Sequence, residues 1–366
     1  MIGGALINSS IEIKLFHQKD KDEWNNFVCS NPNATIFHTT GWMNVIKETF
    51  NFDPKYLVVK NSIGRIIAIS PAFLVKTLFG KVIVSQPFFE YGGPLVDKGY
   101  ENAHEEILEF YKNEVETNNL KYVELRISPQ TINEEISRNF IDKGYLKQFK
   151  AYDFYLDLVG KDYEKDIWNG LYTKKSRIRN SVKKAINSGV RVVEDNDINV
   201  YYELYIKTLE KLGSPPYPKA FFRNIKKYID SKYVRFTFAY LNGEPISALM
   251  SYPFNKRDLM IGLVSDETYQ EYRANDLLYN EQIEYATKNK YDIIDFGRTR
   301  PNSSYERYKE KWGARKVDLY SYVYPPSENK NINPYKHYLT FSRITKRIPW
   351  IFTKTTIGPY LAKKFP

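Results

Sequence analysis

Charged residues follow a short apolar run near the end of the sequence. The segment Asp295–Arg300 contains one carboxylate, one glycine and two arginines. Ligands of α/β proteins collect outside the carboxyl ends of strands, and arginine forks bind phosphate or carboxylate there. We therefore expect Arg298 and Arg300 to contact an anionic substrate. Arg298 is also a candidate catalytic residue that stabilises charge, and Asp295 is a candidate catalytic base. The alternative is a simple turn whose arginines pair with neighbouring acids.

A second cluster is basic. The segment Tyr172–Arg191 holds seven Lys or Arg residues and no acid. Like charges four residues apart destabilise an isolated helix, and an anionic ligand such as a phosphate or an RNA would offset their repulsion. Arg177 and Arg179 are the candidate phosphate-binding residues. The alternative is a solvated basic face with no ligand.

A third segment, Phe88–Leu95, contains Tyr91, Gly92 and Gly93. Such a loop leaves backbone amides accessible to an extended substrate, although a tight turn would need the same residue types. The sequence offers no metal site and no nucleophile: Cys29 is the only cysteine, and the four histidines are scattered without ligand spacing. Any group transfer would have to be direct, with the site supplying position and charge stabilisation.

Hydrophobic periodicity predicts that these segments lie on two similar α/β units. In the first half it predicts strands at 56–60, 66–76 and 82–86, a helix at 102–118, a strand at 122–127, a short helix before Gly144 and a strand at 153–158. The second half repeats that order, with strands at 234–240, 245–252 and 259–264, a helix at 275–289, a strand at 292–296, a short helix and a last strand. The Asn242–Gly243 pair predicts a tight hairpin turn between the first two of these strands. Between the halves lie helices over 163–188, 199–212 and 218–230, with a strand at 190–194. A chain of 366 residues with this duplicated order predicts two domains.

The net charge of +11 is concentrated at the end of the chain, where residues 327–366 carry eight Lys or Arg and one Glu. Aromatic and aliphatic residues are interleaved with these charges, which suits an amphipathic segment at an anionic membrane surface. The alternative is a tail that packs on the second domain. The first residues do not read as a signal peptide, and no apolar run of about 18 residues is present, so we expect a cytoplasmic chain, either free or peripheral at the membrane.

Together, four segments resemble the FemA/FemB/FemX-related transferases over about residues 10–325. They are Phe37–Trp42, Phe89–Leu95, the basic run that ends in Ala185–Val190, and Asp295–Gly297 followed by Tyr308, Lys309, Trp312 and Gly313. The resemblance implies an α/β fold of two tandem GNAT-like (acyl-CoA N-acyltransferase fold) domains. We place them at residues 1–158 and 159–326, followed by the basic tail 327–366.

The resemblance also implies roles for single residues. Lys309 is similar to a family lysine that stabilises charge at the reacting carbonyl or tRNA end, and Tyr308 stands where the family has Phe. Trp42 is similar to the early Trp of the substrate-binding segment, but Ile46 stands where the family has Lys. Tyr305 joins the candidate substrate-binding residues.

The expected enzyme is therefore an acyltransferase that moves an aminoacyl or acyl group to an amine of a cell-envelope precursor. The donor would be aminoacyl-tRNA or acetyl-CoA, without a tightly bound cofactor. The alternative is a CoA-dependent N-acetyltransferase that modifies an amino sugar or polysaccharide precursor. The segment Gln270–Asn275, with Arg273 as a donor-binding candidate, lacks the glycines that expose amides to a pyrophosphate. A third reading is an inactive RNA- or membrane-binding module.

Overall fold

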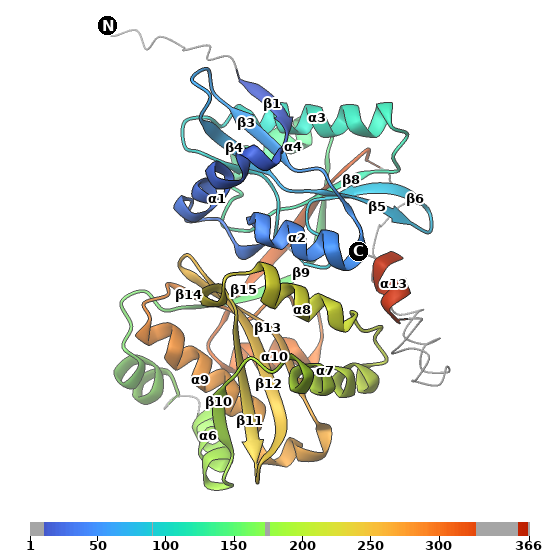
Figure 1. Cartoon of the computed structure of the whole chain (residues 1–366). Helices are drawn as coiled ribbons and strands as arrows, with labels where there is room; N and C mark the ends of the chain where they lie inside the picture. The colour runs from blue at the N-terminus through green and yellow to red at the C-terminus, as the bar shows by residue number, and fades with distance from the viewer. Residues whose placement is uncertain (1–10, 90, 173–175, 327–357, 365–366) are drawn as a thin grey trace, which may run out of the picture. The chain divides into compact units, whose positions relative to one another are not determined.

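The computed structural model describes residues 11–89, 91–172, 176–326 and 358–364 (Figure 1). They form two compact units. Of the described residues, those within 11–43, 51–148 and 320–326 belong to unit 1, and those within 44–50, 149–319 and 358–364 belong to unit 2. A single cut therefore does not separate the units, because β9 (Leu146–Asp157) and β15 (Arg315–Tyr324) each have residues in both.

Unit 1 contains two groups of paired strands. One group has the order β1 (Glu12–Leu15), β3 (Leu57–Lys60), β4 (Ile66–Ser70) and β7 (Leu95–Val96), and all neighbours are antiparallel. The other has the order β15, β8 (Val123–Arg126), β6 (Gly80–Val84), β5 (Phe73–Thr77) and β2 (Asp53–Pro54), in which only β6 and β8 run parallel. The helices of unit 1 are α1 (Lys21–Ser30), α3 (Ala103–Thr117) and α4 (Glu134–Asp142). Helix α2 (Thr40–Phe50) begins in unit 1, and its residues 44–50 belong to unit 2.

The core of unit 1 forms where α3 meets the strands. Ile107, Leu108, Tyr111 and Val115 recur at helical spacing, so their side chains lie on one face of α3. That face packs in one hydrophobic cluster with buried residues of β3, β6 and β8. Its opposite face carries the glutamates of the helix, as the amphipathic pattern requires.

Unit 2 is built on one sheet with the order β10 (Arg191–Glu194), β11 (Arg235–Leu241), β12 (Glu244–Phe254), β13 (Arg257–Ser265), β14 (Ile293–Asp295) and β9. Only β13 and β14 are parallel. The helical segments are Tyr163–Leu171, α6 (Ser176–Asn187), α7 (Ile198–Leu212), α8 (Lys219–Tyr228), α9 (Ala274–Lys288), α10 (Ser304–Lys311) and α13 (Gly358–Lys364).

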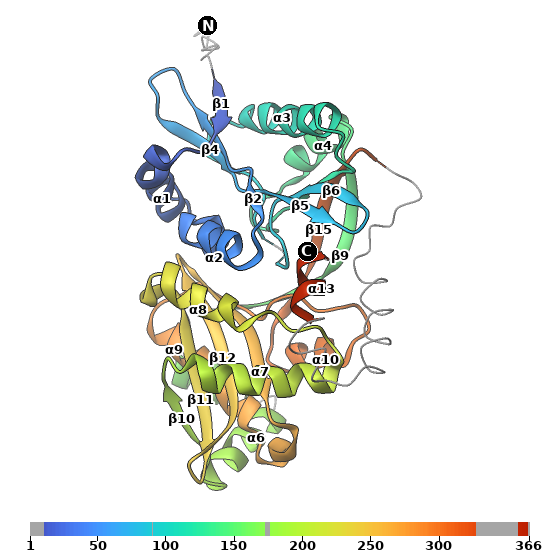
Figure 2. The same cartoon turned by 45° about the vertical axis from the view of Figure 1, so that its right-hand side comes forward.

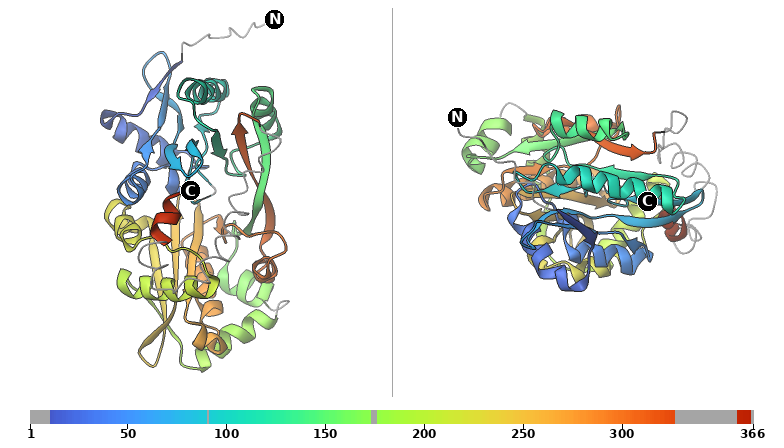
Figure 3. Two further views of the ribbon diagram at one scale, coloured as in Figure 1. Left: turned by 90° about the vertical axis from the view of Figure 1, so that its right-hand side faces the viewer. Right: turned by 90° about the horizontal axis from the view of Figure 1, so that it is seen from above.

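Helices cover both faces of this sheet, and the strand alternation shows which face each helix takes. Leu249 of β12 lies in the cluster that contains α6 and α9, and its neighbour Met250 points to the other face. There Tyr201 of α7 reaches β13, and its hydroxyl donates to the Gly262 carbonyl over 2.8 Å. Figures 2 and 3 show α7 on one side of these strands and α6 with α9 on the other.

The observed elements confirm the predicted α/β class. Most ends shift by one or two residues, but the strand predicted over 153–158 begins at Leu146, and the helix predicted over 163–188 is two helical segments, Tyr163–Leu171 and α6 (Ser176–Asn187). Asn242 and Gly243 both have positive φ, as the predicted hairpin turn requires. The strand predicted over 66–76 is two strands, β4 and β5, because Pro71 interrupts the pairing. Of the predicted amphipathic tail only α13 falls within the described residues.

Candidate active site

Two buried carboxyl groups meet at the end of β14 in unit 2. Asp295 ends β14, and Asp153 lies on the adjacent antiparallel strand β9; both side chains are fully buried. The backbone N–H of Gly297 donates to Asp295 Oδ1 over 2.8 Å, and the N–H of Phe154 donates to Asp153 Oδ1 over the same distance. Each carboxyl group is thereby fixed by its own backbone.

Lys309 brings an ammonium to this pair. It lies on α10 and is 6% exposed. Its Nζ donates to the carbonyl oxygens of Gly297 over 2.6 Å and of Arg298 over 3.3 Å. An ammonium has three N–H donors, and these two carbonyls are its hydrogen-bond acceptors within the described part of the chain. The third N–H of the ammonium has no acceptor among these residues.

Arg257 completes the cluster from the start of β13. Its Nη1 lies 3.4 Å from Asp295 Oδ2, and both side chains are buried. The guanidinium also lies over the ring of Tyr155, 5.4 Å from its centroid. Arg257 therefore favours the charged form of Asp295. Within the described residues, Asp153 forms no ion pair of this kind.

The titration behaviour of the cluster follows from its burial. Burial raises the pKa of Asp153 well above its usual value, and the neighbouring Asp295 raises it further. Burial also raises the pKa of Asp295, but Arg257 opposes that shift. We infer that the pair shares one proton, held mainly by Asp153. Burial lowers the pKa of Lys309 to about 8, against the opposing attraction of both carboxyls.

Such an arrangement can stabilise a developing negative charge. A desolvated ammonium held by fixed carbonyls needs little reorganisation when an oxyanion forms beside it. Its lowered pKa also lets it give up a proton more readily than an ordinary lysine does. The cluster can therefore stabilise charge and donate a proton during a direct group transfer.

The other predicted residues of this region lie at the surface. Arg298 and Arg300 flank the buried Thr299 and are exposed. Tyr305 is 56% exposed on α10. The positive charge of Arg298 contributes to lowering the pKa of Lys309, so it acts on the same cluster. Contact of these side chains with a substrate stays a prediction.

The start of α9 is occupied by a carboxylate of the protein. Asp276 lies in the first turn of α9 and is 4% exposed. Its Oδ1 accepts hydrogen bonds from Tyr308 Oη over 2.9 Å and from Lys311 Nζ over 2.7 Å. Arg273 directly precedes the helix in a left-handed conformation and is exposed. The positive end of the helix dipole thus already faces an anion.

The predicted residues of unit 1 come together, but inside the protein. Trp42 is fully buried, Tyr91 is 2% exposed, and both rings contact Phe37 at centroid distances of 4.7 and 6.5 Å. A Cβ added to Gly93 would lie 2.4 Å from a side-chain carbon of Ile127. Close packing alone requires that glycine. A substrate-binding role for Trp42, Tyr91, Gly92 and Gly93 stays a prediction.

The basic segment forms the exposed face of α6. Ile178, Val182 and Ala185 are buried, whereas Arg177, Lys183 and Lys184 are exposed. Arg179 is half-buried, with its guanidinium 5.2 Å from the centroid of the Trp168 ring. An amphipathic helix with a buried apolar face and an exposed basic face therefore accounts for both the apolar spacing and the basic residues. Phosphate binding by Arg177 and Arg179 stays a prediction.

Sequence reasoning missed Asp153 and Arg257. The only signal for Asp153 was an acid inside the aromatic strand segment Tyr152–Tyr155, where a solvent-facing position was the simpler reading. Arg257 follows the hairpin residues Asn255 and Lys256 and reads as part of a polar turn. Neither residue stands out in the sequence, because each joins the cluster only through the pairing of β9 and β13 with β14.

Comparison with known families decides the class. The family model described as "Acetyltransferase (GNAT) domain" matches residues 173–310, which include β11–β14, α9 and Lys309. The matched stretch is similar to GNAT domains. This match confirms the predicted transferase class. Arg257, Asp295 and Lys309 lie in the matched stretch, and Asp153 lies before it.

Solved structures share the fold of the whole chain. A structure of FemX has a TM-score of 0.67 at 14% identity and covers 86% of this chain and 98% of its own. A tandem GNAT protein from the clavulanic acid biosynthesis pathway has a TM-score of 0.53 at 12% identity, covering 87% and 100%. The C-terminal domain of a putative lysylphosphatidylglycerol synthetase from Agrobacterium fabrum has a TM-score of 0.56 at 11% identity, covering 84% and 92%. These likenesses confirm the predicted FemX-like tandem GNAT fold.

A sequence comparison with curated proteins finds no match. Among the described residues, no group of three or more His, Cys, Asp or Glu side chains could hold a metal ion. Within the same residues, none of the helices has the length and apolar character needed to cross a membrane.

Proposed function

We propose that this GNAT-fold protein transfers an aminoacyl group from an activated ester to an amine of a cell-envelope precursor. The observation that carries the proposal is the buried Lys309 ammonium, held by two carbonyl oxygens beside Asp153 and Asp295. The FemX-like fold adds support, because FemX shares the arrangement of elements over 86% of the chain.

The chemical step needs no covalent intermediate on the enzyme. The acceptor nitrogen attacks the acyl carbon, a C–N bond forms, and the C–O bond of the ester breaks. The amine loses one proton and the departing hydroxyl gains one, so protons balance. Lys309 stabilises the oxyanion or the departing oxygen, while the neighbouring carboxylate of Asp295 favours its charged form against the effect of burial.

Asp276 supports an ester donor in preference to CoA. In the CoA-dependent reading, the pyrophosphate would sit on the N-terminal amides of α9. Here the carboxylate of Asp276, which is 4% exposed, already lies in that first turn. Repulsion between this carboxylate and a diphosphate weakens CoA binding. The exposed basic face of α6, including Arg177, supplies a surface for the phosphates of an aminoacyl-tRNA.

The proposal is tested by replacing Lys309 with Met, which keeps the length of the side chain and removes its charge. We expect transfer to an amine acceptor to fall by about 10²–10³-fold, the usual cost of losing one oxyanion donor. The matched control is Lys288→Met, because Lys288 is an exposed lysine paired with Glu284 on α9. Equal activity of K309M and K288M would overturn the proposal.

The donor is tested by thermal shift of the whole chain with deacylated tRNA, acetyl-CoA and desulfo-CoA at low and high salt. We expect a shift with tRNA that weakens as salt rises, and none with the CoA compounds. A clear shift with acetyl-CoA alone would instead favour the N-acetyltransferase that modifies an amino sugar. Membrane contact through the basic tail is a separate proposal that rests on sequence alone.

A further inference from the structure

The turn between β5 and β6 in unit 1 exposes two large apolar side chains. Leu78 is 51% exposed and Phe79 is 66% exposed. Thr77 pairs with Gly80 across the hairpin, so Leu78 and Phe79 are the two central residues of its turn. Figure 1 shows this hairpin extending away from α1 of the same unit. The transfer proposed for unit 2 gives these two side chains no role.

Hydrogen bonds fix the shape of this turn. The Thr77 hydroxyl donates to the Gly80 carbonyl oxygen over 2.8 Å and accepts the Phe79 N–H over 3.1 Å. Gly80 has a φ of 128°, a conformation that favours glycine. The turn therefore holds Leu78 and Phe79 at the tip of the hairpin, and a partner that covers them needs little further ordering of the backbone.

A row of three exposed lysines lies beside this tip and consists of Lys76, Lys81 and Lys121. Lys76 and Lys81 are directly opposite on β5 and β6, so they project from the same face of the sheet. The Lys121 N–H donates to the Lys81 carbonyl oxygen over 2.8 Å. Ile83 and Val123, each two residues further along the chain, are partners in the buried core. Because side chains alternate along a strand, Lys81 and Lys121 lie on that same face.

The two segments that carry these lysines contain no acid. Residues 71–85 and 117–123 hold three Lys and no Asp or Glu. Like charges directly opposite one another weaken a hairpin, and Lys81 and Lys121 form no ion pair within the described residues. An anionic surface in contact with the row would offset this repulsion.

The combination of an apolar tip with a lysine row favours an anionic lipid surface over other partners. At the boundary of a bilayer, apolar side chains enter the acyl region while ammonium groups meet lipid phosphates. A protein interface usually needs about 20–30 residues on each side, far more than one turn provides. Single-stranded RNA is held by aromatic rings that stack on bases, whereas Leu78 has no ring to stack.

We propose that the β5–β6 turn docks unit 1 on an anionic lipid surface. Leu78 and Phe79 enter the boundary between headgroups and acyl chains, and the three lysines of the row contact lipid phosphates. This docking site is distinct from the basic tail, of which the structure describes only residues 358–364. It is also independent of the transfer proposed for unit 2, so K309M should bind vesicles as wild type does.

The test is sedimentation of the full chain with vesicles of phosphatidylcholine, with and without phosphatidylglycerol. We expect Leu78→Ser combined with Phe79→Ser to weaken binding to the anionic vesicles by about 10-fold or more, because the apolar contact is lost. Replacing all three lysines of the row with Gln should weaken binding about 10-fold and remove the preference for phosphatidylglycerol. Every variant keeps the basic tail, so these differences report on the hairpin alone.

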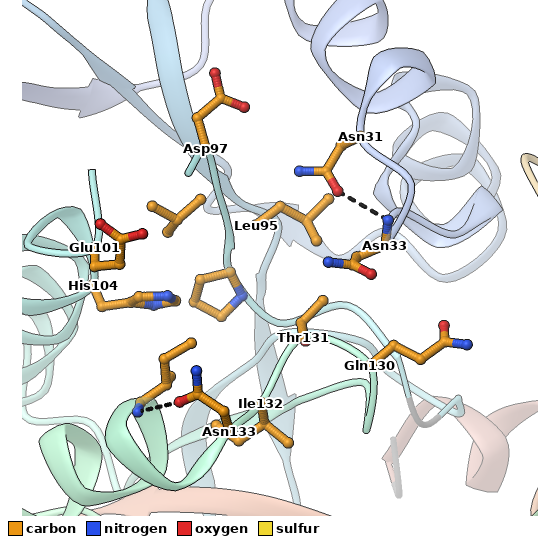
Figure 4. Close-up of a pocket in the computed structure, with 13 residues that line it drawn as sticks. Asn31, Asn33, Leu95, Asp97, Glu101, His104, Gln130, Thr131, Ile132 and Asn133 are labelled. Carbon is orange, nitrogen blue, oxygen red and sulfur yellow. Dashed lines mark hydrogen bonds between the residues drawn. The ribbon is translucent and has the colours of Figure 1, made fainter. Parts of the chain in front are cut away.

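The matched control is Ile63→Ser. Ile63 is 83% exposed on the turn between β3 and β4, where the surrounding charge is mixed. Arg65 pairs there with Asp97 over 3.4 Å, and Figure 4 shows Asp97 and a second acid, Glu101, around a cavity of unit 1. I63S should therefore bind both kinds of vesicle within about 2-fold of wild type.

A depth measurement separates insertion of the turn from attraction between charges. Brominated acyl chains quench a tryptophan that enters the bilayer, so they should quench Phe79→Trp more than wild type and Ile63→Trp no more than wild type. The proposal is overturned if wild type does not bind anionic vesicles or if the double serine variant binds them as I63S does. It is also overturned if the hairpin variants lose retention of deacylated tRNA and keep vesicle binding, because the surface would then bind RNA.

Discussion

At the scale of single residues, the candidate active site raises the question of how one buried ammonium keeps its charge. Lys309 loses hydration, and two carbonyl oxygens and two nearby carboxyls replace it. Asp153 and Asp295 are not equivalent, because Arg257 lies beside Asp295 only. Chemistry at this site therefore depends on which carboxyl holds the shared proton.

The pH dependence of transfer should report on Lys309. Because its pKa is lowered to about 8, the ammonium is lost as pH rises through that value. If the charged form stabilises the oxyanion, kcat falls above about pH 8 with the slope of one proton. A pH–rate profile measures this. A rise in kcat over the same range would instead make the neutral amine the active form, acting as a base.

The lowered pKa of Lys309 also makes the free energy of unfolding depend on pH. The folded pKa of Lys309 lies below that of an unfolded lysine, so the unfolded chain binds more protons between these values. The contribution of Lys309 to the free energy of unfolding therefore rises as pH increases from about 8 to about 10.4. Urea unfolding of wild type and K309M across this range should show a difference that changes with pH. A constant difference would contradict the lowered pKa.

Replacement of each carboxyl should separate their roles. Asp153→Asn resembles the protonated acid in shape, so we expect a change of less than about 1 kcal/mol in the free energy of unfolding. Asp295→Asn leaves the buried Arg257 without its carboxylate and should cost roughly 3 kcal/mol. Urea unfolding at pH 7 measures both. A larger loss for D153N than for D295N would place the charge on Asp153.

Sequence reasoning found Asp295 and Lys309 but not the partners that set their charge. Lys309 was found by resemblance, and Asp295 by its place after an apolar run. Asp153 and Arg257 are distant in sequence and join the site only because β9 and β13 flank β14. The hydrophobic alternation of one strand does not show which distant strand it pairs with.

At the scale of elements, the start of α9 shows how a helix terminus can be used by the protein itself. Asp276 is stabilised there by the helix dipole, by Lys311 and by the hydroxyl of Tyr308. These contacts tie α9 to α10, the helix that carries Lys309. The terminus therefore helps to position the helix that carries Lys309.

Asp276→Ala should lower the free energy of unfolding by about 1–3 kcal/mol, because it removes two hydrogen bonds at a buried position. The matched control is Glu267→Ala, which removes an exposed ion pair with Lys211 and should cost less than about 1 kcal/mol. Urea unfolding measures both variants. Equal losses would mean that Asp276 does not tie the two helices together.

Most elements could be predicted because their periods are strong and their ends carry turn residues. The helix predicted over 102–118 is α3 at 103–117, and the one over 275–289 is α9 at 274–288. Register and pairing partners were not accessible, because alternation fixes the face of a strand but not its neighbour. The break at Pro71 was missed for a related reason: apolar residues continue on both sides of it.

At the scale of the whole molecule, the division into units cannot be read along the chain. The boundaries predicted at 158 and 326 follow the repeat in the sequence, whereas the packing gives residues 320–324 of β15 to unit 1 and residues 149–157 of β9 to unit 2. Each unit thus takes a strand segment from the far side of the repeat boundary. Whether one repeat folds without the other is tested by expressing it alone.

We expect the fragment 1–158 to lack a cooperative fold when it is expressed alone. It would be missing residues 321–324, which pair with β8, and Tyr322, which is fully buried against Phe140 at a centroid distance of 4.6 Å. Exposing an edge of β8 and the cavity left by Tyr322 should cost several kcal/mol, a large part of the roughly 5–15 kcal/mol by which a domain is stable. Adding residues 315–326 after residue 158 through a flexible linker should restore cooperative urea unfolding, because it supplies the missing strand. Cooperative unfolding of the unmodified fragment at similar stability would show that β15 is dispensable and that the repeat boundary is also a folding boundary.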